Sequence, residues 1–240
     1  MESFIERNQI VKCSKAIHAF IQKERLNGNK DYLDFVKSIW LVFDLDEFQE
    51  THKFKPTLIP LKHTLFDNDS EFFVITKDPQ TKYKEMIEKQ RIKKITRVVG
   101  ISNLRSQLSN KDDRVQLYND YDGVFADEKI IHLLPKILGP VFYNKKKQPM
   151  PINLQSKNLI KEFANAMNST YLLLKHKGIT SVKIATTDFS AKEIFENITY
   201  ALDRIVAQIP GGFKHIRSIR MKTSDSIALV LYKRPEEDDE

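Results

Sequence analysis

The sequence predicts a two-domain protein of the mixed α/β (α+β) class, in which a parallel α/β domain is inserted into a split α+β domain. Three observations lead to this prediction. Residues 38–48 alternate apolar and polar side chains, as in a strand with one buried face. Residues 71–76 (EFFVIT) are almost wholly apolar, as in a strand covered on both faces. From there to residue 150, strands alternate with helices, which is typical of a small parallel sheet. We place the split domain at residues 1–65 and 151–240, and the inserted domain at residues 66–150.

The first part of the split domain begins with a helix. Apolar residues recur at helical spacing over residues 4–25, and the Asn-Gly-Asn sequence at 27–29 ends the helix. The strand over residues 38–48 follows, and a second strand spans residues 54–61. Pro56 and Pro60 place this second strand at a sheet edge. The faces of the first strand are Ile39, Leu41, Phe43 and Leu45 on the apolar side, and Trp40, Val42, Asp44 and Asp46 on the other.

A polar break at residues 67–70 separates this part from the inserted domain. After the apolar strand we expect a helix from Asp78-Pro79 to about residue 90 and a strand over 97–101, with Ser102 capping the next helix. A helix over 111–120, a strand over 122–126 and a helix over 127–138 follow. Gly139-Pro140 ends that helix and leads into a basic loop, so the inserted domain closes on a loop of Lys145, Lys146 and Lys147.

The last third of the chain returns to the α+β pattern. We expect a helix over 156–167 and then strands over 170–174 and 180–187, joined by a turn at residues 177–178. Ser190 and Glu193 form a capping box that starts a helix over 191–209, whose apolar stripe is Ile194, Ile198, Ala201, Ile205 and Ile209. Strands over 213–221 and 227–232 close the domain, and residues 236–240 form an acidic tail. The two connections between the domains, near residues 63–69 and 149–153, would act as a hinge.

Charge and composition limit the function. The chain carries a net charge of +7, and its last five residues are all acidic, so the remainder is more basic still. A basic body favours polyanions such as nucleic acid, although a lysine-rich solvated surface is the ordinary alternative. We expect no membrane span and no secretory signal. The lone cysteine, Cys13, excludes an intrachain disulfide and suits a reducing compartment.

Motifs for catalysis and cofactor binding are missing. The sequence contains neither of the two Gly-rich phosphate-binding motifs, G-x-G-x-x-G and G-x-x-x-x-G-K-S/T, and it has only seven glycines. It also shows no nucleophile elbow. The histidines, among them His132, fall at no metal-binding spacing. Asp44 and Asp46 share one strand face and could act as an acid/base pair, but a solvated strand face explains them as well. We therefore predict no enzyme, no metal and no cofactor.

Two basic stretches remain as candidate sites. Lys145, Lys146 and Lys147 are framed by Phe142 and Tyr143, and lysines near aromatic rings pair with phosphates while the rings stack on bases. An ordinary solvated loop is the alternative. In the second stretch an extended strand places Lys214, Ser218, Arg220 and Lys222 on one side, beside the polar turn 223–226. Basic groups with small hydroxyls suit the shallow minor groove of folded RNA, although surface strands often carry such residues.

Five sequence landmarks, in this order, resemble the ribosomal protein L1 family over about residues 35–232. They are the strand 38–48, FFVITKD at 72–78, the strand, helix and L-G-P loop at 122–151, EIFENI at 193–198, and the closing strands with RMKT at 220–223. The loop FYNKKKQPMPINL and the ending KTSDSIAL are most similar to the eukaryotic branch of ribosomal L1-domain-containing proteins that assemble ribosomes. The resemblance implies an L1-like fold, with a Rossmann-like inserted domain and an RNA-binding split domain.

The sequence departs from the ribosomal members at two positions. Their RNA-contact turn reads Thr-Met-Gly-Pro, and the matching residues here are Thr223, Ser224, Asp225 and Ser226. Ile39 stands where the family has a strand phenylalanine. An unpaired carboxylate at Asp225 would repel RNA phosphates. Both changes are similar to what the assembly-factor branch shows.

The resemblance implies a non-catalytic rRNA-binding protein that acts on pre-ribosomal particles in the nucleus and nucleolus, where rRNA processing occurs. Its partners would be rRNA or pre-rRNA and pre-ribosomal proteins, and we expect a monomer. Two alternatives stay open: a structural ribosomal protein of the large-subunit stalk, and a protein-interaction scaffold that does not bind RNA. The candidate RNA-binding residues are Lys145, Lys146, Lys147, Lys214, Arg217, Arg220, Lys222, Thr223 and Ser224.

Overall fold

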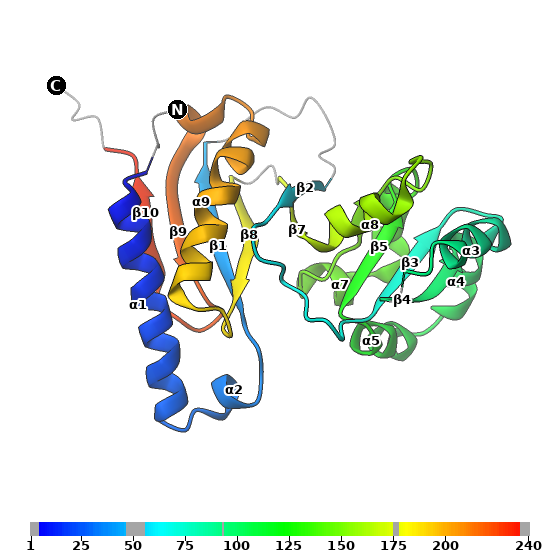
Figure 1. Cartoon of the computed structure of the whole chain (residues 1–240), viewed down its shortest axis with the longest axis horizontal. Coiled ribbons are helices and arrows are strands. Elements are labelled where there is room, and N and C mark those ends of the chain that lie inside the picture. Colours follow the sequence, from blue (N-terminus) through cyan, green and yellow to red (C-terminus); the bar gives the residue numbers. More distant parts are fainter. Residues whose placement is uncertain (1–4, 47–55, 93, 175–177, 236–240) are drawn as a thin grey trace. The chain divides into compact units, whose positions relative to one another are not determined.

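The computed structural model describes residues 5–46, 56–92, 94–174 and 178–235, and the chain divides into two compact units. The first unit combines residues 1–65 with 169–240, and the second is the continuous stretch 66–168. The first unit is therefore assembled from both ends of the chain, and the second is inserted between its halves (Figure 1). Among the described residues, no helix is long and apolar enough to cross a membrane.

The first unit is a four-stranded antiparallel sheet with helices on one face. The sheet has the order β10-β9-β1-β8, and α1 and α9 cover it (Figure 1). A separate two-stranded sheet pairs β2 with β7. The elements are α1 (Arg7–Leu26), α2 (Lys30–Leu33), β1 (Ser38–Leu45), β2 (Thr57–Pro60), β7 (Ser169–Leu172), β8 (Ile179–Thr186), α9 (Ala191–Gln208), the 3-10 helix η2 (Gly212–His215), β9 (Ile216–Lys222) and β10 (Leu229–Lys233).

The alternation in β1 explains this arrangement. Its four apolar side chains are fully buried, and they pack with the apolar stripe of α9 in one core. The capping box also forms, because the Ser190 hydroxyl accepts the Glu193 N–H and the Glu193 carboxylate accepts the Ser190 N–H. The predictions for β1 and α9 are confirmed. The predicted edge position of β2 is confirmed too, since in the described chain β2 pairs only with β7.

A buried asparagine fixes the segment that leaves β2. Asn197 of α9 is fully buried, and its side-chain oxygen accepts the backbone N–H of His63 at 2.7 Å. Its side-chain nitrogen donates to the carbonyls of His63 at 3.0 Å and Ile184 at 2.9 Å. One polar side chain in the core therefore ties the segment after β2 to α9 and β8.

The second unit is a four-stranded parallel sheet of order β4-β3-β5-β6. All five residues of β3 and all five of β5 are buried, which confirms the sandwiched strand predicted at 71–76. The elements are β3 (Phe72–Thr76), α3 (Gln80–Lys89), β4 (Ile95–Gly100), α4 (Ile101–Gln107), α5 (Lys111–Asp120), β5 (Gly123–Asp127), the 3-10 helix η1 (Ile131–Leu133), α6 (Leu134–Leu138), α7 (Pro140–Asn144), β6 (Met150–Ile152) and α8 (Leu159–Met167).

Several predicted boundaries differ from the structure. The helix predicted at 127–138 is wrong over its first half: Asp127 ends β5, and α6 begins only at Leu134. Pro135 gives the reason, because proline lacks the N–H that a helix interior needs and suits the first turn. Ser102 does not cap α4. It lies inside the helix and donates to Asp78 at 2.5 Å.

The parallel unit also extends to Asn168, whereas the sequence placed its boundary at residue 150. Met150–Ile152 adds β6 to the sheet beside β5, and Phe163 of α8 packs on Phe125 with ring centroids 5.6 Å apart. A three-residue strand that contains Pro151 carries too little pattern to be recognised in sequence. The predicted turn at 177 and the acidic tail lie outside the described residues.

Candidate nucleic-acid interface

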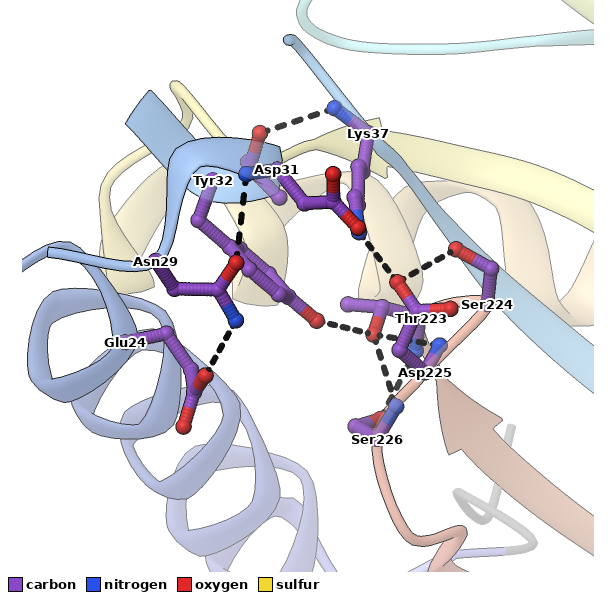
Figure 2. Close-up of polar contacts among 10 residues, drawn as sticks. Glu24, Asn29, Asp31, Tyr32, Lys37, Thr223, Ser224, Asp225 and Ser226 are labelled. Atoms are coloured by element: carbon purple, nitrogen blue, oxygen red, sulfur yellow. Dashed lines mark hydrogen bonds and ion pairs between the residues drawn. The ribbon is translucent and has the colours of Figure 1, made fainter. Parts of the chain in front are cut away.

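A buried hydroxyl holds the turn that follows β9. The Thr223 side chain is fully buried, and its oxygen accepts the backbone N–H of Ser226 at 3.0 Å and of Asp225 at 3.4 Å. The Tyr32 hydroxyl lies 3.1 Å from it, and Ser226 Oγ accepts the Thr223 N–H at 2.9 Å (Figure 2). Thr223, a candidate RNA contact, therefore faces the interior and fixes the turn. Ser224 is exposed at its tip.

The carboxylate of Asp225 in this turn forms an ion pair with Lys37. The Lys37 ammonium donates a short hydrogen bond to Asp225 and lies 3.5 Å from Asp31 (Figure 2). The hydrogen bond from Lys37 lowers the pKa of Asp225. Burial by itself lowers the pKa of Lys37, but the hydrogen bond and charge of Asp225, with Asp31, raise it overall. The repulsion expected from an unpaired Asp225 is thus reduced, because the charge is matched within the protein.

The outer face of the sheet, opposite α1 and α9, carries the basic side chains of β9. Ile216, Ile219 and Met221 are buried, while Arg217, Ser218, Arg220 and Lys222 reach solvent to different degrees. A bulge explains why Arg217 joins the outer face. Ile216 pairs with Leu45 and Ser218 with Asp44, so one residue of β9 is extra at this point. We call the outward side chains of the four strands the open face.

Two carboxylates, Asp44 of β1 and Asp46 directly after this strand, balance part of this positive charge. Asp44 lies 2.7 Å from Arg217 and 4.0 Å from Arg220. Asp46 lies 2.8 Å from Arg234, whose hydrogen bond lowers the pKa of Asp46. Each carboxylate therefore serves as a counterion for arginine. This geometry supports the solvated-face interpretation of the two aspartates over an acid/base pair.

An open hollow of about 560 Å³ lies at this end of the open face. Four cationic side chains and one carboxylate line it, so the lining is strongly positive; the lining residues are Asp44, Arg217, Ser218, Arg220, Val230, Lys233, Arg234 and Pro235. In the part of the chain that the structure describes, the Nε of Arg220 is buried with no hydrogen-bond partner. A concave surface of this charge concentrates polyanions.

Lys214 does not belong to β9, whereas the sequence placed it on the same strand face as Ser218, Arg220 and Lys222. Phe213–His215 belong to the 3-10 helix η2, which starts at Gly212 after the left-handed Gly211, and β9 begins only at Ile216. The strand periodicity therefore does not reach Lys214, which is exposed and precedes the first residue of β9. Its carbonyl accepts a hydrogen bond from Arg234.

The lysine loop of the second unit is organised around a tyrosine of α5. Lys145 and Lys147 place their ammonium groups 4.9 and 4.4 Å from the centroid of the Tyr118 ring. Lys147 also donates to the Tyr118 carbonyl at 2.5 Å, and burial lowers its pKa. Lys145 and Lys146 form the turn, with Lys146 in a left-handed conformation. Lys147 is therefore largely committed to internal contacts.

Of the two aromatic residues that frame this loop, Phe142 does not offer the predicted stacking surface, whereas Tyr143 is only partly buried. Phe142 is fully buried and packs edge-on against Tyr118, with centroids 5.6 Å apart. Burial raises the pKa of Tyr143 to about 12. The aromatic partner of Lys145 and Lys147 is Tyr118. Because Tyr118 lies far from the loop in sequence, the sequence pattern did not reveal this contact.

The structure also places the remaining residues that the sequence singled out for catalysis or metal binding. The described residues contain no group of three or more His, Cys, Asp or Glu side chains that could hold a metal ion. His132 is exposed in η1. Cys13 is a buried free thiol whose pKa is raised by burial.

We expect the first unit to lose stability in acid. Arg234, Lys37 and Ser190 lower the folded-state pKa values of Asp46, Asp225 and Glu193 through hydrogen bonds. A lowered pKa contributes stability that is present above the unfolded pKa, about 4, and is lost as the pH falls through the folded value. The unfolding temperature, measured from about pH 7 to about pH 3, should fall below about pH 4. The Asp225→Asn variant should show a weaker fall, and an equal fall would contradict the role of this pair.

Sequence reasoning missed four contributors to these sites. The four residues come from separate parts of the sequence and reach these sites through tertiary contacts; they are Lys37, Tyr118 and the adjacent pair Lys233 and Arg234. Only Arg234 and Lys233 carried a signal, because they directly follow the last strand pattern.

Comparison with known proteins gives a consistent result. The family model described as "Ribosomal protein L1p/L10e family" matches residues 11–227. A Schizosaccharomyces pombe protein named putative ribosome biogenesis protein C8F11.04 is 31% identical over 89% of this chain and 59% of its own length. The mouse ribosomal L1 domain-containing protein 1 is 25% identical over 95% of this chain and 52% of its own. The chain thus spans somewhat more than half the length of these two relatives. The Saccharomyces cerevisiae ribosome biogenesis protein UTP30 is 28% identical over 95% of this chain and 93% of its own length.

Proposed function

This chain belongs to the ribosomal protein L1p/L10e family, and from that premise we propose that it is a non-catalytic RNA-binding factor of ribosome assembly. It would act on pre-ribosomal particles in the nucleus and nucleolus, with rRNA or pre-rRNA and pre-ribosomal proteins as partners. Three relatives that carry ribosome biogenesis in their names support the assembly role, and they match 89% to 95% of the chain.

The observation that carries RNA binding is the positive hollow on the open face of the first unit. Four cationic side chains line this hollow. Two come from β9, one comes from β10, and one comes from the residue directly after β10; they are Arg217, Arg220, Lys233 and Arg234. Arginine forks bind phosphate oxygens in pairs, and most affinity for nucleic acid comes from such phosphate contacts. Lys222, farther along β9, extends the positive surface toward Ser224.

The lysine loop would supply a second contact from the other unit. Lys145 and Lys146 are the members of this loop that extend into the turn, whereas Lys147 is held against Tyr118. We assign the first two to a second RNA segment or a pre-ribosomal protein. The internal contacts of Lys147 suit a role in shaping the loop.

The alternative of a structural stalk protein has less support. The large-subunit relatives from Chlamydomonas reinhardtii and Neurospora crassa match 55% and 56% of this chain, against 95% for the yeast biogenesis protein. The turn 223–226 also departs from the Thr-Met-Gly-Pro sequence of the ribosomal members, and Asp225 is held by Lys37.

We expect RNA affinity to fall steeply with salt. Each phosphate contact adds close to one unit to the slope of log affinity against log salt, so three to five contacts give a slope of roughly −3 to −5. Binding to structured rRNA fragments over a potassium chloride series measures this slope. A flat salt response, or no binding at low salt, would overturn the RNA proposal.

Sedimentation of cell extracts tests the assembly role separately. The chain, carrying an epitope tag, should travel with precursor particles and be missing from translating ribosomes. Its presence on polysomes would instead identify a structural ribosomal protein.

A further inference from the structure

Trp40 lies on the open face of the first unit. It is the single tryptophan of the chain, lies on β1, one of the two inner strands of the sheet, and is half-buried. Its strand neighbours Ile39 and Leu41 are fully buried on the other face. Part of the Trp40 side chain is therefore accessible to solvent, and the rest is covered by its neighbours.

Two lysines flank this indole. In the sheet register Trp40 pairs directly with Lys222 of β9 on one side and with Lys183 of β8 on the other. Directly paired residues on one face have Cβ atoms about 5 Å apart, and lysine side chains are long enough to reach past the ring. The row Lys183–Trp40–Lys222 thus places one aromatic surface between two cations.

The next row along the strands continues the same surface. Val42 pairs with Ser181 of β8 and with Arg220 of β9. A small apolar side chain lies between a hydroxyl and a guanidinium, and the hollow with Arg217 follows. The open face therefore combines an indole ring and a valine on β1 with cations on both neighbouring strands.

From this juxtaposition we infer that the open face binds an unpaired ribonucleotide, whose base stacks on Trp40 while Lys183 and Lys222 bind the neighbouring phosphates. This inference rests on the proposed function and names the form of RNA that the site takes. Stacking requires a base whose own face is uncovered, and bases within a duplex are already covered by their neighbours. A loop, bulge or single-stranded segment of RNA meets this requirement, whereas a helix does not.

Tryptophan fluorescence of the native chain tests the contact directly, because every photon of indole emission comes from Trp40. Titration with single-stranded oligouridylate or oligoadenylate at low salt should quench the emission with the same midpoint as a gel shift. Duplex RNA of equal length should quench much less at equal binding. Binding in the gel without any change in emission would overturn the stacking contact and leave the RNA proposal standing. No binding in either measurement would overturn both.

Substitutions provide the second measurement. If one base stacks on Trp40, the Trp40→Leu variant should bind single-stranded RNA about ten-fold more weakly than the native chain. The Trp40→Phe variant should lose less affinity, because it keeps an aromatic ring. Duplex binding should change by less than about two-fold in either variant. An unchanged single-strand affinity in Trp40→Leu, with an unfolding temperature near that of the native chain, contradicts the inference.

Lysine variants separate the flanking cations from general charge. Lys183→Gln and Lys222→Gln should each weaken single-stranded RNA binding and reduce the salt slope by about one. The matched control is Lys15→Gln, since Lys15 is exposed on α1, which covers the other face of the sheet. Equal losses in all three variants would show that net charge, and not this row, determines binding.

Discussion

Replacing Arg217 and Arg220 together with glutamine should weaken binding to structured rRNA by roughly 100-fold at low salt and reduce the salt slope by about two. The two guanidinium groups line one hollow, and the change removes half of its four cationic side chains. Gel shifts over a salt series measure both quantities. The variant should still unfold cooperatively, because both residues lie on the solvent side of β9.

A second variant, expected to strengthen binding, tests whether the two arginines bind RNA or only form ion pairs within the protein. Asp44 lies 2.7 Å from Arg217 and 4.0 Å from Arg220, so Asp44→Asn removes their counterion without changing side-chain size. If the arginines bind phosphate, Asp44→Asn should strengthen RNA binding several-fold. The double variant Lys12→Gln and Lys15→Gln, on exposed positions of α1, removes the same charge elsewhere and serves as the control. An unchanged affinity in the arginine variant, or weaker binding in Asp44→Asn, contradicts the assignment.

Asn197→Ala should destabilise the first unit by about 3 kcal/mol, a large fraction of the stability of a typical domain. The change removes three hydrogen bonds and leaves backbone groups of His63 and Ile184 without their partner in the core. Urea unfolding followed by circular dichroism measures the loss. Thr199→Ala, at an exposed position of the same helix, should change the stability by less than about 0.5 kcal/mol. Equal effects in the two variants would show that Asn197 is not a special anchor.

Elements with strong local patterns could be predicted from sequence. The alternation in β1, the apolar run of β3 and the capping box of α9 each determine their structure through nearby residues, and all three are confirmed. Elements that depend on short segments were not predictable in the same way. Pro135 divides the expected helix, and β6 needs its neighbour β5 to form a strand at all.

The candidate interface could be predicted only in part, for a similar reason. Strand periodicity gives Ser218, Arg220 and Lys222 their shared face, whereas Arg217 reaches it through a bulge that depends on pairing with β1. The burial of Thr223 and the pairing of Asp225 depend on Tyr32 and Lys37, which come from the opposite end of the chain. Contacts over such separations leave no local signature in a single sequence.

The split of the first unit has a consequence during synthesis. Strand β1 pairs with β8 and β9, which emerge from the ribosome long after it, whereas residues 66–168 are contiguous and form a unit by themselves. Domains generally fold as units as the chain is made. A nascent chain that ends before residue 179 therefore bears a hydrophobic strand without a partner, with Ile39, Leu41, Phe43 and Leu45 open to association. For this protein, the interval between translation of the two halves is the period of greatest risk of aggregation.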